Sequence, residues 1–193
     1  MTVCLLLAAG SSSRMAKPKM LLLFNGKTLL QHVIDETKKV NENKLLVVTG
    51  CYHSLLKEIL AQQQIDFIEN QHWEEGMSSS IQTGIAYIMQ HYHNVNSVII
   101  IVCDQPYISA ALLDELIAVK QQTHKGIVAA AYNDTTGTPV LFDKKYFEKL
   151  ALLHGQYGAK KLLQQFKDDV ARVVFSLGEV DIDTKEDYEN LKQ

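Results

Sequence analysis

The chain has 193 residues, of which 47% are hydrophobic and 21% are charged, and it contains only 3 prolines. This composition excludes a disordered chain, and the length suits one α/β domain that spans residues 1–193. The formal net charge of −3 argues against a nucleic-acid partner, because proteins that bind nucleic acid usually carry a basic face. Any phosphate-binding site must therefore be local.

No segment of the sequence predicts a membrane partner. The apolar N-terminus lacks a basic start, and no run reaches the roughly 18 apolar residues of a transmembrane helix, so we expect a cytoplasmic protein. The 7 histidines lack metal-ligand spacing, and we expect them on the surface or in loops. The cysteines form no C-x-x-C pair and lie in or beside apolar runs, which predicts small buried thiols in a reducing compartment at Cys4, Cys51 and Cys103.

The first half of the chain alternates strands with helices. Thr2–Ala8 is a continuous apolar run, typical of a strand covered on both faces, and a polar loop at Gly10–Lys19 follows it. Thr28 is predicted to cap a helix with apolar residues in helical spacing from Leu29 to Val40. The next predicted elements are a strand at Lys44–Thr49, a helix at Ser54–Gln63, a strand at Asp66–Glu69, a helix at Ser78–Gln90 with Ile81, Ile85, Ile88 and Met89 on its buried side, and a strand at Ser97–Cys103.

The second half continues this alternation. The predicted elements are a helix at Ala110–Gln122 capped by Ser109, strands at Gly126–Tyr132 and Thr138–Phe142 around a turn at Asn133–Gly137, helices near Lys144–Leu152 and Gly158–Phe166, a strand at Ala171–Ser176, and a last helix that Thr184 and Asp187 open with a capping box. Such alternation implies a mostly parallel sheet covered on both faces. Ligands of these sheets lie at the carboxyl ends of the strands, which directs attention to the loops after Ala8 and Cys103.

The loop after the first predicted strand, Ala8–Lys19, combines small residues with cations. Small side chains let backbone N–H groups approach a polyphosphate closely, and the serines add hydroxyl donors. Arg14 can form bidentate contacts with phosphate oxygens, and Lys19 supplies a compact charge. The loop is neither a P-loop nor a G-x-G-x-x-G turn. The alternative is a surface loop whose lysines are merely solvated.

Two acidic segments are candidates for a metal site. Asp104 ends the most apolar strand, where a rigidly held carboxylate can bind the Mg²⁺ that carries NTP phosphates. The alternative is a turn or capping residue before Pro106. Near the C-terminus, Asp181 and Asp183 offer two more carboxylates, of which we expect one to face the site.

The middle segment Asn70–Ile81 is a loop that enters a helix through three serines. The serines can simply cap the helix, or their hydroxyl and backbone N–H groups can bind a nucleobase edge. Trp73 can stack on a ligand, although a single tryptophan before a helix more often packs against the core.

These separated segments, in this order, closely resemble the nucleotidyltransferases related to molybdenum cofactor cytidylyltransferase and guanylyltransferase. The resemblance extends from Leu7 to Tyr188 and also includes the segments Gly137–Phe142, Gly155–Lys160 and Val180–Asp187. It implies a Rossmann-like three-layer sandwich of the glycosyltransferase-A type, in agreement with the alternation of strands and helices.

The resemblance also implies a site. Its catalytic residues would be Arg14, Lys19 and Asp104, and Mg²⁺ would be bound by Asp104 and Asp183. Asp181 is the alternative second ligand. A further alternative is that this segment only caps the following helix. The expected nucleotide contacts are Leu7, Ala8, Ala9, Gly10, Ser12, Arg14, Lys19, Ser79, Ser80 and Gly84.

The sequence departs from the family pattern at several positions. Ala16, Gln71 and Lys185 replace Gly, Pro and Pro, while Gln156 and Lys160 replace Asp and Arg. The last two departures bear on the acceptor, because a carboxylate is lost and lysine cannot form arginine's bidentate contact.

The implied function is a Mg²⁺-dependent transfer of CMP from CTP to the phosphate of molybdopterin, with release of pyrophosphate. Leu-Ala-Ala-Gly at Leu7–Gly10 and Cys-Asp-Gln-Pro at Cys103–Pro106 favour CTP over GTP. The alternatives are a guanylyltransferase, a sugar-phosphate nucleotidyltransferase, or a non-catalytic accessory protein that binds the cofactor for a molybdenum hydroxylase client.

Overall fold

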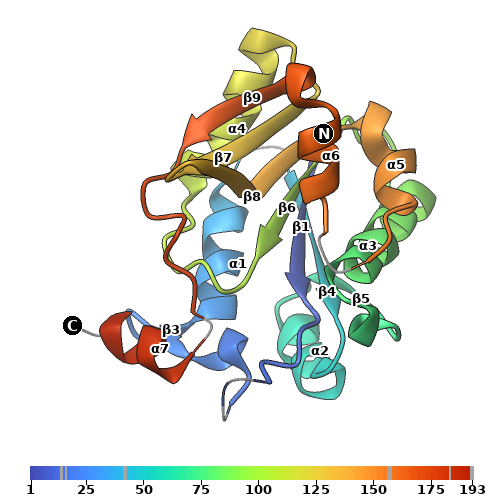
Figure 1. The fold of residues 1–193 in the computed structure, drawn as a ribbon. Coiled ribbons are helices and arrows are strands. Elements are labelled where there is room, and N and C mark those ends of the chain that lie inside the picture. The colour runs from blue at the N-terminus through green and yellow to red at the C-terminus, as the bar shows by residue number, and fades with distance from the viewer. Residues whose placement is uncertain (14, 16, 41–42, 156–157, 183, 192–193) are drawn as a thin grey trace.

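The computed structural model describes residues 1–13, 15, 17–40, 43–155, 158–182 and 184–191 (Figure 1). Seven strands form the central sheet in the order β5-β4-β1-β6-β8-β7-β9. Their bounds are β1 Thr2–Ala8, β4 Asn43–Thr49, β5 Asp66–Glu69, β6 Ser97–Val102, β7 Ile127–Tyr132, β8 Thr135–Asp143 and β9 Val170–Val174. All neighbouring pairs are parallel except those of β8, which runs antiparallel to β6 and β7. The predicted, mostly parallel sheet is confirmed.

Helices cover both faces of the sheet (Figure 1). One apolar cluster contains residues of α1 (Leu29–Lys39), α2 (His53–Gln62) and α4 (Ala110–Thr123). The other contains residues of α3 (Met77–His91), α5 (Phe147–Ala151) and α6 (Lys160–Gln165). The inner strands β1, β6 and β7 are mostly buried, as continuous apolar runs predict, whereas the edge strands β5 and β9 keep exposed residues. The three-layer sandwich is therefore confirmed.

A small subassembly lies beside the carboxyl edge of the sheet. It consists of the hairpin β2 (Leu23–Phe24) and β3 (Lys27–Thr28) together with α7 (Lys185–Leu191), which lie close together in Figure 1. The Tyr188 hydroxyl bonds both the N–H and the carbonyl of Leu23, at 3.1 and 3.0 Å. The predicted capping box is confirmed, since Thr184 N donates to Asp187 Oδ2 and Asp187 N donates to Thr184 Oγ1.

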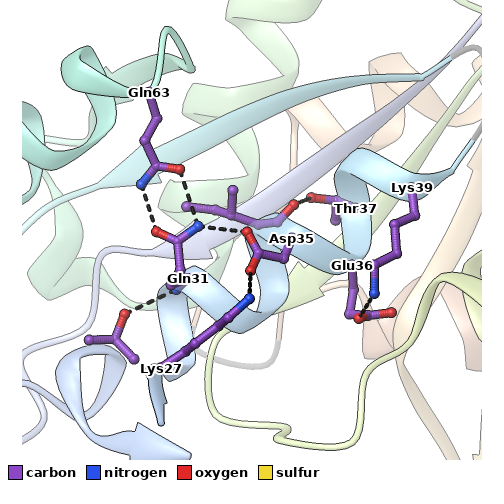
Figure 2. Close-up of polar contacts among 9 residues, drawn as sticks. Lys27, Gln31, Asp35, Glu36, Thr37, Lys39 and Gln63 are labelled. Carbon is purple, nitrogen blue, oxygen red and sulfur yellow. Dashed lines mark hydrogen bonds and ion pairs between the residues drawn. The ribbon is translucent and has the colours of Figure 1, made fainter. Parts of the chain in front are cut away.

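A polar network fixes α1 against its neighbours (Figure 2). The Gln31 and Gln63 side-chain amides bond each other reciprocally, at 3.2 and 2.8 Å, and so join α1 to the end of α2. Asp35 accepts from Lys27 at 2.5 Å and from Gln31 at 2.7 Å, and the hydrogen bond from Lys27 lowers its pKa. On the other side, Glu36 accepts from the Ala110 backbone N–H at the start of α4. These contacts orient α1 beside the sheet edge where the candidate site lies.

The structure corrects several local predictions. The hairpin between β7 and β8 turns at Asn133 and Asp134 alone, because the left-handed φ of Asn133 allows a tight turn and pairing resumes at Thr135. Met89 is 53% exposed, since it lies one position, and so about 100°, beyond the buried Ile88. Cys4 and Cys103 are buried as predicted, but Cys51 is exposed in the turn after β4.

Two histidines also lie elsewhere than predicted. His32 and His53 are partly buried on helices. The His32 ring nitrogen Nε2 lies 3.1 Å from the Ile108 carbonyl, and His53 Nδ1 lies 2.8 Å from Thr49 Oγ1. Among the helices of the described part of the chain, none is long and apolar enough to cross a membrane.

Asp169 joins three elements on the face opposite α1. Its carboxylate accepts hydrogen bonds from the Gly126 N–H at 3.0 Å, the Tyr146 hydroxyl at 2.6 Å and the Lys145 ammonium at 2.8 Å. Burial alone would raise the pKa of Asp169, but the bonds from Lys145, Tyr146 and Gly126 outweigh burial and lower it to about 2. The ionised form is therefore the one that stabilises the fold.

We expect Asp169→Asn to lower the free energy of unfolding by about 1 kcal/mol near neutral pH. This value allows for solvent screening, because the Asp169 side chain is 29% exposed. A depressed pKa contributes stability above the unfolded pKa of 3.8 and loses it as the pH falls toward about 2. In urea unfolding, the difference in free energy of unfolding between wild type and variant should thus disappear as the pH falls from 3.8 to about 2. Asp168→Asn, an exposed neighbour, is the control, and a gap that does not change with pH would contradict this account.

Candidate functional site

A cavity of about 250 Å³ lies at the carboxyl ends of β1 and β6. It is where the topology places ligands of a parallel sheet. Most of the predicted nucleotide contacts meet there, together with two residues of the segment before α3. The lining residues are Leu7, Ala8, Ala9, Gly10, Ser12, Lys19, Met20, Trp73, Gly76, Met77, Ser80, Val102, Cys103 and Asp104.

The loop after β1 is held in shape by Ser12. This residue has a left-handed φ of 51°, its carbonyl accepts from Met15 N at 2.8 Å, and its hydroxyl accepts from Lys19 N at 3.0 Å. The turn thereby returns the chain to the sheet edge at the start of the short helix η1 (Lys19–Leu21). Arg14, the other predicted phosphate ligand of this loop, lies outside the described residues.

The turn after β4 supports the same loop from the opposite side. Cys51 N donates to the Ala9 carbonyl at 3.1 Å, and the Tyr52 hydroxyl donates to the Ser11 carbonyl at 2.7 Å. A Cβ on Gly50 would lie 2.7 Å from the Ala9 carbonyl oxygen and 2.8 Å from the Trp73 Cβ. Gly50 and Tyr52 were missed by sequence reasoning, although their position directly after a predicted strand was an available signal.

Lys19 and Asp104 meet across the cavity. The Lys19 ammonium lies 2.8 Å from Asp104 Oδ2, and the two side chains are only 20% and 24% exposed. The two residues are 85 positions apart in the chain. The structure thus brings together the predicted phosphate-binding lysine and the predicted metal ligand.

The C-terminal acidic segment is also tied to Asp104. Ile182 N donates to the Asp104 carbonyl at 3.0 Å, and the Ile182 side chain is buried with Leu22 and Leu29. Burial raises the pKa of Tyr132, and the negative charges of Asp181 and Asp104 raise it further, so Asp181 acts on the Tyr132 side of the site. Asp183 lies outside the described residues, and its pairing with Asp104 on a metal remains a prediction.

The side chains at this site suit a cation that binds together with the nucleotide. In the part of the chain that the structure describes, no three His, Cys, Asp or Glu side chains gather to hold a metal by themselves. Mg²⁺ does not need such a cage, because it takes one or two carboxylates and fills its shell with phosphate oxygens and water. The Asp104 carboxylate beside the loop after β1 therefore fits Mg²⁺ that is bound to NTP phosphates. Burial raises the pKa of the neighbouring Cys103 thiol, which disfavours its thiolate form.

Two serines in the first turn of α3 have different contacts. Asn70 Nδ2 donates to the hydroxyls of Ser79 and Ser80, at 2.9 and 3.0 Å. Ser79 Oγ also lies 2.8 Å from the carbonyl oxygens of His72 and Gly76, so it closes the turn that starts the helix. Ser80, by contrast, lines the cavity. Ser79 therefore ties the first turn of α3 to the segment before it and caps no helix N–H, while Ser80 lines the cavity.

Gly84 lies apart from the cavity. A Cβ there would collide with the Leu5 side chain and touch Val48, so this glycine lets α3 approach the sheet closely. Its position explains a packing requirement, and Gly84 is not among the residues that line the cavity. Trp73, in the short helix η2 (Trp73–Glu75), is partly exposed and lines the cavity.

A second hollow of about 340 Å³ lies between β8, the start of α3 and α6, and it shares Met77 with the first cavity. Its floor is apolar, its rim carries hydroxyl groups, and one cation, Lys160, lines it. The Gly137 position leaves room for the Tyr132 hydroxyl, which a Cβ there would meet. Gln156, whose departure from the family pattern bears on the acceptor, lies outside the described residues. The lining residues are Met77, Ile81, Ile100, Tyr132, Thr135, Thr136, Gly137, Thr138, Val140, Ala159, Lys160 and Leu163.

The chain is similar to known proteins over most of its length. Residues 4–170 match the family model described as a MobA-like NTP transferase domain. A curated relative, the bifunctional protein GlmU of Francisella philomiragia, is 30% identical over 141 residues. That alignment covers 72% of this chain but only 30% of GlmU, so the chain spans less than a third of the curated relatives it matches.

Solved structures agree over almost the whole chain. The crystal structure of Rv0371c from Mycobacterium tuberculosis H37Rv has a TM-score of 0.83 at 27% identity, over 98% of this chain and 96% of that one. A complex of Rv0371c with manganese has a TM-score of 0.80 at 26% identity, over 98% and 97% of the two chains. The predicted Rossmann-like sandwich of the glycosyltransferase-A type is thereby confirmed.

Proposed function

The chain belongs to the family of MobA-like NTP transferase domains, and from this premise we propose that it transfers a nucleoside monophosphate from an NTP to a phosphorylated acceptor, with release of pyrophosphate. The observation that carries the proposal is the Lys19–Asp104 pair, which spans a cavity lined by the loop after β1. A phosphate-binding cation and a metal-binding carboxylate are the two groups that nucleotidyl transfer needs at one place.

We assign the nucleotide to the first cavity. The backbone from Leu7 to Gly10 and the hydroxyls of Ser12 and Ser80 would contact it, and Arg14 and Lys19 would bind its phosphates. Asp104 would hold Mg²⁺, with Asp183 as the proposed second ligand. When bound, Mg²⁺ would offset the negative charge on the phosphates. Ser79 and Gly84 are left out, because their contacts lie in the helix start and the core.

The proposed reaction needs no strong general base. An oxygen of the acceptor phosphate forms a bond to the α-phosphorus of the NTP, and the bond from that phosphorus to the bridging oxygen breaks. The electron pair leaves with pyrophosphate. The acceptor phosphate is already ionised at neutral pH, so catalysis rests on positioning and on charge stabilisation by Lys19 and Arg14.

We propose CTP as the nucleotide and molybdopterin or its molybdenum-loaded form as the acceptor. Leu-Ala-Ala-Gly at Leu7–Gly10 and Cys-Asp-Gln-Pro at Cys103–Pro106 support the choice of CTP. The second hollow would receive the acceptor, because it adjoins the first cavity at Met77 and offers Lys160 to an anionic group. A molybdenum hydroxylase would then be the client of the product.

The first test is pyrophosphate release in the presence of Mg²⁺. CTP, GTP, ATP and UTP are compared with and without molybdopterin and its molybdenum-loaded form. We expect release with CTP only, and only when the acceptor is present. Release with GTP alone would make the protein a guanylyltransferase. Release with a sugar phosphate in place of molybdopterin would make it a sugar-phosphate nucleotidyltransferase. Cofactor binding without turnover for any of the four nucleotides would indicate an accessory protein.

A further inference from the structure

Lys19 and Asp104 contact each other directly at the first cavity. The ammonium of Lys19 lies 2.8 Å from Asp104 Oδ2, within a cavity that leaves both side chains less than a quarter exposed. The Lys19 backbone N–H is bonded separately to the Ser12 hydroxyl at 3.0 Å. The position of the main chain is thus secured by one bond, while the side-chain charge is engaged by another.

In the proposed reaction, both members of this pair have other partners. Lys19 would bind phosphate, and Asp104 would bind the divalent cation. An ammonium at 2.8 Å already neutralises the carboxylate and lies where a cation would approach Oδ2. A metal ion that arrives alone must therefore displace Lys19, whereas nucleotide phosphates offer Lys19 a new partner and release the carboxylate.

We propose that Lys19 is a resident counter-ion of Asp104, which weakens metal binding when no nucleotide is bound and makes metal affinity depend on nucleotide. This inference rests on the proposed function and adds an order of binding to it. The metal binds weakly by itself and binds well once nucleotide is present. The coupling is reciprocal, because each ligand raises the affinity of the other by the same factor.

The proposal predicts effects of opposite sign from one substitution. Lys19→Met removes the ammonium and leaves the backbone bond to Ser12 in place. It should tighten binding of Mn²⁺ alone by about fivefold or more, as expected for loss of a competing ion pair. It should weaken binding of CTP by about tenfold, because a phosphate contact is lost. An ordinary binding residue would weaken both.

The measurement uses Mn²⁺ as the probe and the full chain. Free Mn²⁺ is quantified by electron paramagnetic resonance during titration, without nucleotide and then with saturating CTP, and CTP affinity is measured by calorimetry. Lys17→Met is the matched control, because Lys17 is an exposed lysine of the same loop. It removes the same charge without touching the pair, and its affinity for Mn²⁺ alone should stay within about twofold of wild type.

The outcomes separate this inference from the proposed function. Circular dichroism verifies that each variant is folded. If Asp104→Asn abolishes Mn²⁺ binding but Lys19→Met binds Mn²⁺ alone no more tightly than Lys17→Met does, the counter-ion role is wrong and the metal site stands. If Asp104→Asn binds Mn²⁺ as well as wild type does, the metal assignment itself is wrong.

Discussion

Replacing Asp104 with asparagine is expected to reduce Mg²⁺-dependent pyrophosphate release by a factor of about 10³ or more. Asparagine has nearly the same shape, so the turn after β6 and the bond from Ile182 N to the residue-104 carbonyl should persist. What is lost is the charge that would hold the metal, and loss of charge stabilisation at the reacting phosphate costs several orders of magnitude in rate. The ion pair with Lys19 would also be lost.

The measurement is a steady-state assay of pyrophosphate release at saturating nucleotide, with a Mg²⁺ titration for each variant. Asp114→Asn makes the same charge change on the exposed side of α4 and should retain wild-type turnover. Unfolding by urea should place Asp104→Asn within about 1 kcal/mol of wild type, because the lost ion pair is partly exposed. Near-normal turnover in folded Asp104→Asn protein would refute the metal assignment.

Gly50→Ala is expected to lower kcat/KM by about 10²-fold while the protein stays folded. The added Cβ would lie 2.7 Å from the Ala9 carbonyl oxygen and 2.8 Å from both the Ala9 and Trp73 Cβ atoms. These atoms cannot rotate away, so the main chain must shift. Ala9 and Trp73 line the cavity, and a shift of the loop after β1 would misplace every backbone donor to the nucleotide.

The control for Gly50→Ala is Cys51→Ala, the next residue along the turn. The Cys51 side chain is exposed, and its backbone bond to Ala9 does not depend on the thiol, so its activity should stay near wild type. Nucleotide affinity and stability are measured for both variants. If Gly50→Ala protein had wild-type kcat/KM and wild-type nucleotide affinity, the packing of this turn would not position the loop.

Much of the fold follows from local properties of the sequence. Continuous apolar runs identify β1, β4 and β6, because a strand covered on both faces has no polar side. Thr28 and Ser109 cap α1 and α4 as predicted, since the capping bond joins residues three positions apart and needs no tertiary contact. Where helical spacing alone was used to assign burial, as for Met89, the result was wrong, because the width of the buried stripe depends on what packs against it.

In the candidate site, too, some features follow from the sequence and others depend on the tertiary structure. The sequence by itself determined which residue types could bind phosphate and metal, and that they follow strands whose carboxyl ends meet at one edge. Only the tertiary structure decided that Lys19 pairs with Asp104 and that Ser80 lines the cavity while Ser79 bonds the segment before its helix. It also decided that Gly50 and Gly84 are points of close approach. These contacts join segments far apart in the chain, so their geometry depends on how strands and helices pack, which local propensity and spacing do not encode.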